Sequence, residues 1–237
     1  MNGEMNIMIG TAVTVAFLHT LVGPDHYLPF IVMGKARNWS YFRTTLITTG
    51  AGLAHVLGSV ILGLVGVAAG IGIQKITDVD TVRGSIAAWL FVGFGLAYMA
   101  WGIRHAYRKR PHTHIHLHPD GIQHEHQHTH TSGHTHFHDM PDRKNITPWI
   151  LFTIFVLGPC EPLIPIVMYP AAKGNYHELI ITVTVFGVIT IMAMLGLVLG
   201  TLFGLNFLPL GKLERYSHAL AGFAILFSGA GILFMGW

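Results

Sequence analysis

Long apolar stretches separated by short polar connections dominate the chain. Six of them hold 18 or more nearly uncharged residues, the length that a helix needs to cross the hydrocarbon core of a bilayer. These stretches are residues 5–33, 44–73, 84–103, 146–170, 178–205 and 217–236. A transmembrane β-barrel would instead show short segments of alternating hydrophobicity. The pattern therefore predicts an all-α polytopic membrane protein with six transmembrane helices.

Composition and charge agree with this class and orient it. Only 11% of the 237 residues are charged, against about a quarter in a typical soluble domain. Eleven of the 14 lysines and arginines fall in alternate connections, and the other three are Lys75, Arg83 and Lys173. By the positive-inside rule, both termini lie outside a plasma membrane and residues 104–145 lie in the cytoplasm. The lipid bilayer accounts for this charge pattern, so the basic pI near 9.1 predicts no nucleic-acid partner.

Two segments of the chain resemble each other and suggest an internal repeat. GPDHYL-PFIVM at 23–33 resembles GPCEPLIPIVM at 158–168 when one gap is allowed, and GFGLAYMAWGI at 93–103 more weakly resembles GFAILFSGAGI at 222–232. Because each half holds three spans, an odd number, the second half is inverted relative to the first. We expect a first three-helix repeat at 1–103, a cytoplasmic loop at 104–145 and a second three-helix repeat at 146–237.

Helix breakers stand at matching places in the two predicted halves. Proline removes a backbone hydrogen bond, so the Gly-Pro pairs at 23–24 and 158–159 predict broken first and fourth helices. Each break lies beside an acidic residue, Asp25 or Glu161. Paired broken helices in corresponding positions mark the central site of many transporters.

The acidic residues at these breaks need compensation. A carboxylate near the middle of the membrane costs about 2.5–3.5 kcal/mol, and the six predicted spans contain no lysine or arginine to pair with it. A bound divalent cation would supply the missing charge, with imidazole and carboxylate groups as ligands. Alone, a membrane histidine also fits a helix–helix hydrogen bond, and a lone cysteine fits apolar packing. The candidate metal ligands are His19, Asp25, His26, His55, Cys160 and Glu161.

Two of these segments resemble a known family. FLHTLVGPDHYLPF at 17–30 looks like the motif of the nickel/cobalt transporter group and its urease-accessory-like and sulfite-exporter-type relatives. GAGLAHVLG at 50–58 is similar to a second histidine-bearing helix of that group. The resemblance implies transport of a divalent cation, with His19, Asp25 and His26 matching the motif. It leaves Ni²⁺, Co²⁺ and Zn²⁺ open as substrates.

The segment GPCEPLIP raises a different class. It resembles the Pro-Cys-x-x-Pro motifs of cytochrome c biogenesis proteins, which carry reducing equivalents across membranes. That chemistry cycles two cysteines between dithiol and disulfide, and this chain has one cysteine, Cys160. A shared scaffold is still expected. An organic-anion or sulfite transporter is a further alternative, but it would require a cationic clamp rather than two acidic residues.

The loop between the predicted halves is rich in histidine. Residues 112–138 contain eleven histidines without apolar periodicity, which predicts an extended or disordered metal-binding segment. HEHQH at 124–128 fits the H-E-x-x-H zinc-protease pattern, but that chemistry requires a helix and a third ligand. We therefore predict a transporter of divalent transition metals and not an enzyme.

Overall fold

The first half of the chain begins with a helix that is interrupted near its middle. The computed structural model describes every residue except 1–2, 109–111, 118–122, 129–146, 208–210 and 236–237. Its first half contains α1 (Gly3–Val22), the 3-10 helix η1 (Pro24–His26), α2 (Leu28–Ala36), α3 (Tyr41–Ala68) and α4 (Ile73–Arg108). The break falls at the Gly-Pro pair, as the sequence predicts.

The second half also has one helix on either side of a break, both of them short, followed by two long helices. It contains α5 (Thr147–Val156), α6 (Leu163–Ala172), α7 (Tyr176–Leu205), the 3-10 helix η2 (Gly211–Tyr216) and α8 (Ser217–Met235). In each half, the first long helix after the break, α3 or α7, starts at a side-chain cap. Ser40 accepts a hydrogen bond from the backbone N–H of Arg43 at the start of α3, and Asn175 accepts one from Glu178 at the start of α7.

Five helices in the described part of the chain are long and apolar enough to cross a membrane. They correspond to α1, α3, α4, α7 and α8, with the last of them counted from Leu213. The span expected at 146–170 is divided into α5 and α6, of ten residues each, and the break between them contains the Gly-Pro pair at 158–159, where the sequence predicts it. The chain is thus a multi-pass membrane protein whose described residues are helical apart from one short hairpin and the connections.

One prediction about the spans is wrong. α4 begins at Ile73 rather than near residue 84, so Arg83 lies inside a candidate membrane span. Asp80 on the same helix is fully buried, and its carboxylate lies 2.7 Å from the Arg83 guanidinium. The sequence pattern missed this pair because the charges at 75–83 lower the local hydropathy and resemble a connection.

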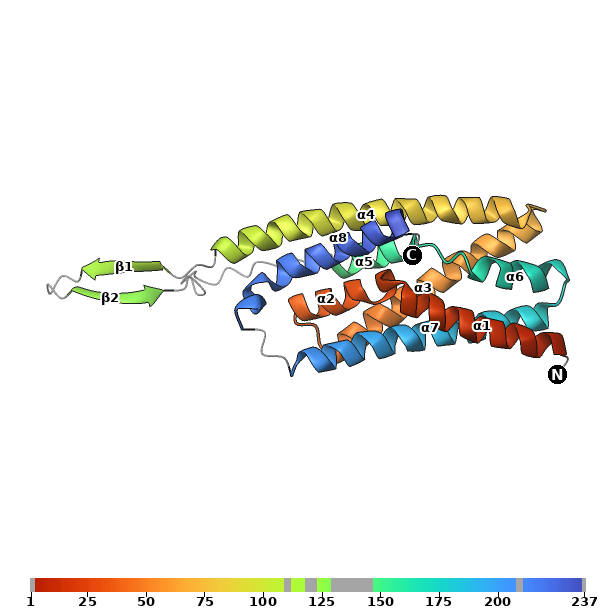
Figure 1. The fold of residues 1–237 in the computed structure, drawn as a ribbon, viewed down its shortest axis with the longest axis horizontal. Coiled ribbons are helices and arrows are strands. Elements are labelled where there is room, and N and C mark those ends of the chain that lie inside the picture. Colours follow the sequence, from red (N-terminus) through yellow and green to blue (C-terminus); the bar gives the residue numbers. More distant parts are fainter. Residues whose placement is uncertain (1–2, 109–111, 118–122, 129–146, 208–210, 236–237) are drawn as a thin grey trace, which may run out of the picture.

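The helices of the two halves pack on each other in a reciprocal way. α1 and α2 contact α7, whereas α5 and α6 contact α3, and the largest contact joins α4 to α8 (Figure 1). Glycines at the α4–α8 contact touch the backbone of the opposite helix: Gly95 meets Leu226, and Gly222 meets Met99. A side chain at either position would separate the helices, which explains the small residues in these two segments.

The histidine-rich segment forms a hairpin at one end of the bundle. β1 (His112–Leu117) pairs antiparallel with β2 (Gln123–His128), and the register places His112 opposite His128. These residues are thus extended, one of the two states that the sequence predicts, and the remaining histidines of the loop lie outside the described residues. HEHQH falls in β2, whereas the zinc-protease pattern requires a helix.

Candidate metal site

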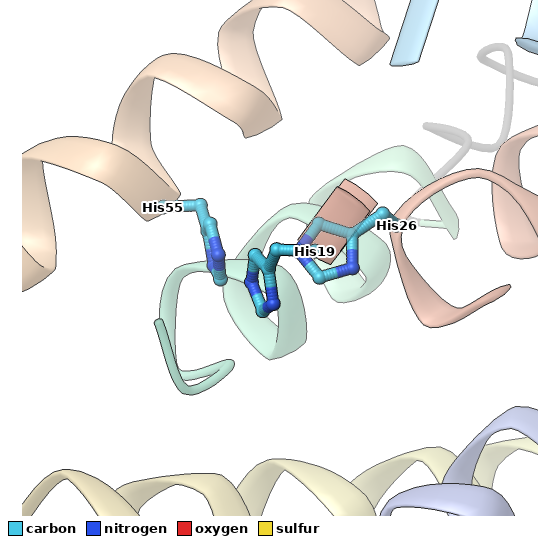
Figure 2. Close-up of side chains that lie close together, drawn as sticks. All are labelled: His19, His26 and His55. Atoms are coloured by element: carbon cyan, nitrogen blue, oxygen red, sulfur yellow. The ribbon is translucent and has the colours of Figure 1, made fainter. Parts of the chain in front are cut away.

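Three histidines from three elements converge where α1 breaks. His19 lies near the end of α1, His26 ends η1, and His55 lies in the middle of α3. One ligand nitrogen from each ring lies within 4.8 Å of the corresponding atoms of the other two. Figure 2 shows the three rings side by side between these elements. We call His19, His26 and His55 the histidine triad.

The free nitrogens of the triad all belong to the same ring position. The Nε2 atoms of His19, His26 and His55 are buried and have no hydrogen-bond partner among the described residues. His26 and His55 are each only 1% exposed. A buried polar atom without a partner is costly, by about 1–3 kcal/mol. Three such atoms within one cluster of histidines therefore suggest a ligand that the triad binds.

In His26 and His55, the other ring nitrogen, Nδ1, is held by oxygen atoms. His26 Nδ1 lies 3.2 Å from Asp25 Oδ1 and 3.2 Å from the carbonyl of Gly23. His55 Nδ1 lies 3.2 Å from the carbonyl of Phe155, at the end of α5. An Nδ1–H that donates to a carboxylate or carbonyl leaves the Nε2 lone pair available for a metal ion. Asp25 and Phe155 thus orient two of the three rings.

The Gly-Pro break gives the triad its local geometry. Gly23 ends α1 in an extended conformation, and Pro24 begins the 3-10 turn that carries Asp25 and His26. A Cβ atom on Gly23 would lie 2.7 Å from His26 Nδ1 and 2.8 Å from Asp25 Oδ1. Only glycine therefore fits here, because the side chains of the next turn fold back over the break.

Aromatic rings surround the triad on the α5 side. The Phe155 ring lies 4.9 Å from the His55 ring and 5.7 Å from the His26 ring, measured between centroids. Phe30 packs on the other edge of Phe155 at 5.2 Å. Both phenylalanines are almost fully buried, so they exclude water from this side of the site. A low-polarity wall of this kind strengthens charge interactions within the site.

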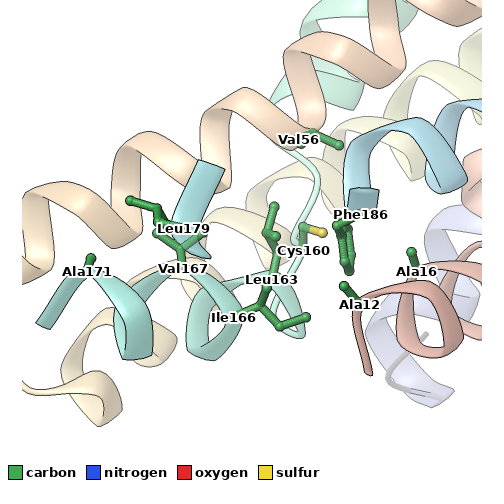
Figure 3. Packing of buried hydrophobic residues seen from close by; sticks show 10 residues of the cluster. All are labelled: Ala12, Ala16, Val56, Cys160, Leu163, Ile166, Val167, Ala171, Leu179 and Phe186. Atoms are coloured by element: carbon green, nitrogen blue, oxygen red, sulfur yellow. The ribbon is translucent and has the colours of Figure 1, made fainter. Parts of the chain in front are cut away.

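The other two predicted ligands lie away from the triad. Cys160 is fully buried in an apolar cluster with Val56, Leu163 and Phe186, which Figure 3 shows around its sulfur. Glu161, the next residue, is exposed, and its carboxylate accepts a 2.8 Å hydrogen bond from the Thr81 hydroxyl on α4. The structure thus brings together His19, His26 and His55 with Asp25 beside them, whereas neither Cys160 nor Glu161 belongs to this group of mutually close ligand atoms.

A buried ion pair that the sequence reasoning missed holds the second break in place. The backbone N–H of Cys160 donates to Asp80 Oδ2 at 3.1 Å. The Arg83 guanidinium donates to the carbonyl of Gly158 at 3.0 Å and to the Ser59 hydroxyl at 2.6 Å. The spacing of Asp80 and Arg83, three residues apart, would have indicated this pair had the segment been taken as helical.

Comparison with known proteins identifies the scaffold. The family model described as the cytochrome c biogenesis protein transmembrane region matches residues 33–231. That range holds most of both halves, including His55, Cys160 and Glu161, but it begins after His19 and His26. A search of the curated proteins and a search of the solved structures each find no significant match to the chain.

Proposed function

Since the chain belongs to the family of cytochrome c biogenesis protein transmembrane regions, we propose that it uses this multi-pass membrane scaffold to transport a divalent transition-metal ion through the histidine triad. The substrate on this proposal is Ni²⁺, Co²⁺ or Zn²⁺, because imidazole suits all three. The resemblance of residues 17–30 to nickel/cobalt transporters supports the same class of substrate.

A single observation carries the proposal. The three buried Nε2 atoms of the triad have no partner among the described residues, and one nitrogen of each ring lies within 4.8 Å of those of the other two. Asp25, only 3% exposed, supplies negative charge directly beside His26. A cation bound here would satisfy the ring nitrogens and offset the buried carboxylate at the same time.

Alternating access is the mechanism that this architecture supports. α4 and α8 run in opposite directions along the bundle (Figure 1). The broken helix α1–α2 packs on α7, and the broken helix α5–α6 packs on α3. Both features are expected of two inverted three-helix halves, in which α5 and α6 together form the sixth crossing. The triad joins α1, η1 and α3, and Phe155 connects it to α5. A relative movement of the halves would therefore change the site.

Transfer of reducing equivalents is the second candidate, because of the family and because Cys160 lies in the second break. Thiol–disulfide exchange requires a second thiol, and the chain contains one cysteine. Cys160 is also fully buried among apolar side chains. This candidate would need a partner thiol from another molecule to reach that position, so the metal proposal accounts for more of the observed site.

The proposal is tested by uptake of Ni²⁺, Co²⁺ and Zn²⁺ into proteoliposomes that contain the full-length protein. His26→Ala and His55→Ala should each reduce uptake to the level of empty vesicles. His177→Ala, at an exposed position near the start of α7, is the matched control and should retain uptake. Uptake that survives both triad substitutions would refute the proposal.

A further inference from the structure

A cavity of about 270 Å³ lies beside the histidine triad and shares one residue with it. Its lining includes Thr81 and Ser85 of α4, Pro159 and Glu161 of the second break, and His19 of the triad. A water molecule takes up about 30 Å³ in the liquid, so a cation with six waters needs roughly 200 Å³. The cavity is thus large enough for a hydrated ion. We call it the access cavity.

The α4 residues that line the access cavity lie in the part of this helix nearest its start, at the end of the bundle that is opposite the hairpin (Figure 1). This end carries the start of α1 and the start of α4 (Figure 1). Thr81 is eight residues from the start of α4, about 12 Å along the helix, whereas His19 is sixteen residues from the start of α1, about 24 Å. The α4 part of the lining therefore lies nearer to that end of the bundle than His19 does, which favours access from that end.

The polar lining indicates that water, rather than lipid, fills this space. Glu161 is exposed although it lies in the break of a membrane segment, and a carboxylate facing hydrocarbon would cost several kcal/mol. Thr81 and Ser85, both exposed, add hydroxyl groups to the same wall. An aqueous cavity is the environment that permits this arrangement.

Glu161 provides the charge of the cavity. It is the one acidic or basic side chain other than His19 among the lining residues. Asp80 and Arg83, which are not part of the lining, form an ion pair with each other. Gly84 allows Pro159 to pack closely against α4, where a Cβ would lie 2.7 Å from the Pro159 ring. This contact and the Thr81 hydrogen bond keep the carboxylate on the cavity wall.

We propose that the access cavity is a water-filled vestibule in which Glu161 attracts a hydrated divalent cation before the ion enters the triad at His19. The inference rests on the proposed function. It gives Glu161 a role in capturing the ion rather than in the dehydrated site, and it assigns the side from which the triad is reached in this conformation.

The first test measures how uptake by proteoliposomes depends on metal concentration at low ionic strength. Glu161→Gln should raise KM about tenfold, as expected for a dication about 6 Å from a carboxylate in water, and should leave the maximal rate unchanged. The difference should shrink at high salt, because salt screens a hydrated ion from the carboxylate. Glu4→Gln, an exposed carboxylate on α1, is the matched control and should not change KM.

The second test determines the side of access, in a Cys160→Ala background with an impermeant thiol reagent. Ser85→Cys should react from the membrane side opposite to that of a hairpin reporter, Thr113→Cys. An unchanged KM in Glu161→Gln, a salt-independent loss of maximal rate, or labelling of Ser85→Cys from the hairpin side or not at all would overturn the vestibule. If His26→Ala also retains transport, the proposed role of the histidine triad is wrong. This result distinguishes failure of the proposed function from failure of the vestibule alone.

Discussion

At the scale of single residues, the negative charge of Asp25 is the feature that most directly favours a cation in the triad. Asp25→Asn keeps the volume and can still accept a hydrogen bond from His26 Nδ1, but it removes the charge. We expect metal transport to be abolished and metal affinity to fall by about 10–100-fold, as for other groups that orient metal ligands. The metal-free protein should be as stable or more stable, because a buried anion is removed.

Titration of the purified protein with Co²⁺, followed by its visible absorption, measures the affinity, and thermal unfolding measures the stability. Asp78→Asn, at an exposed position near the start of α4, is the control. Unchanged Co²⁺ affinity in Asp25→Asn would contradict the role given to the carboxylate.

Gly23 is the second position where a single atom matters. Gly23→Ala would place a Cβ within 2.8 Å of both Asp25 and His26, so the 3-10 turn must shift. We expect a loss of about 1–3 kcal/mol in unfolding free energy, the usual cost of overpacking, together with weaker metal binding. A Cβ on Gly10, which lies in α1, would meet nothing within 4 Å, so Gly10→Ala should leave metal binding unchanged. Equal Co²⁺ affinity in both variants would show that the break does not position the triad.

At the scale of elements, one turn of α4 holds the second break. Arg83→Leu would leave Asp80 buried without its partner, and such a loss costs about 3–5 kcal/mol. The double variant Asp80→Asn/Arg83→Leu should recover part of this loss, since the unpaired charge is gone. Denaturant unfolding of the three variants (Asp80→Asn, Arg83→Leu and the double) in detergent measures the coupling free energy. Strictly additive effects would mean that the pair contributes nothing as a pair.

The hairpin is a second element whose role can be separated from that of the membrane helices. Deletion of residues 112–138 should leave metal transport running, with a changed apparent affinity, because a tether outside the bilayer can concentrate ions but cannot form a dehydrated site within it. Uptake into proteoliposomes compares this deletion with His26→Ala. If the deletion stops transport and the triad substitution spares it, the division of labour between the two histidine sets is the reverse of the one proposed.

At the scale of the whole molecule, the ends of the bundle predict a topology. The start of α1 and the hairpin lie at opposite ends (Figure 1), and the lysines and arginines concentrate in the connections at the hairpin end. By the positive-inside rule the hairpin is cytoplasmic and the N-terminus is outside. Impermeant labelling of cysteines at Thr113 and Asn6 in intact cells should therefore modify only the second. Labelling of the hairpin from outside would reverse the orientation and the side of the access cavity.

The features that sequence reasoning predicted correctly are those that local interactions control. Hydropathy over about twenty residues determined the membrane class, and the Gly-Pro pair determined where α1 breaks, since a proline acts on the backbone of its own turn. His19, Asp25 and His26 lie within eight residues, so the break alone brings them near one another. This part of the site was available before any fold was known.

Tertiary packing decided the rest, because contacts between distant segments depend on how each helix is rotated and placed. His55 joins the triad through the position of α3, with its ring held by a carbonyl one hundred residues away. Cys160 and Glu161 are adjacent in the chain, yet one is buried among apolar side chains and the other is held on a cavity wall by Thr81, eighty residues away. Spacing along the chain could not separate these two residues. Their different environments arise from the α4 turn that packs against the second break, where Asp80 and Arg83 are satisfied only in the folded bundle.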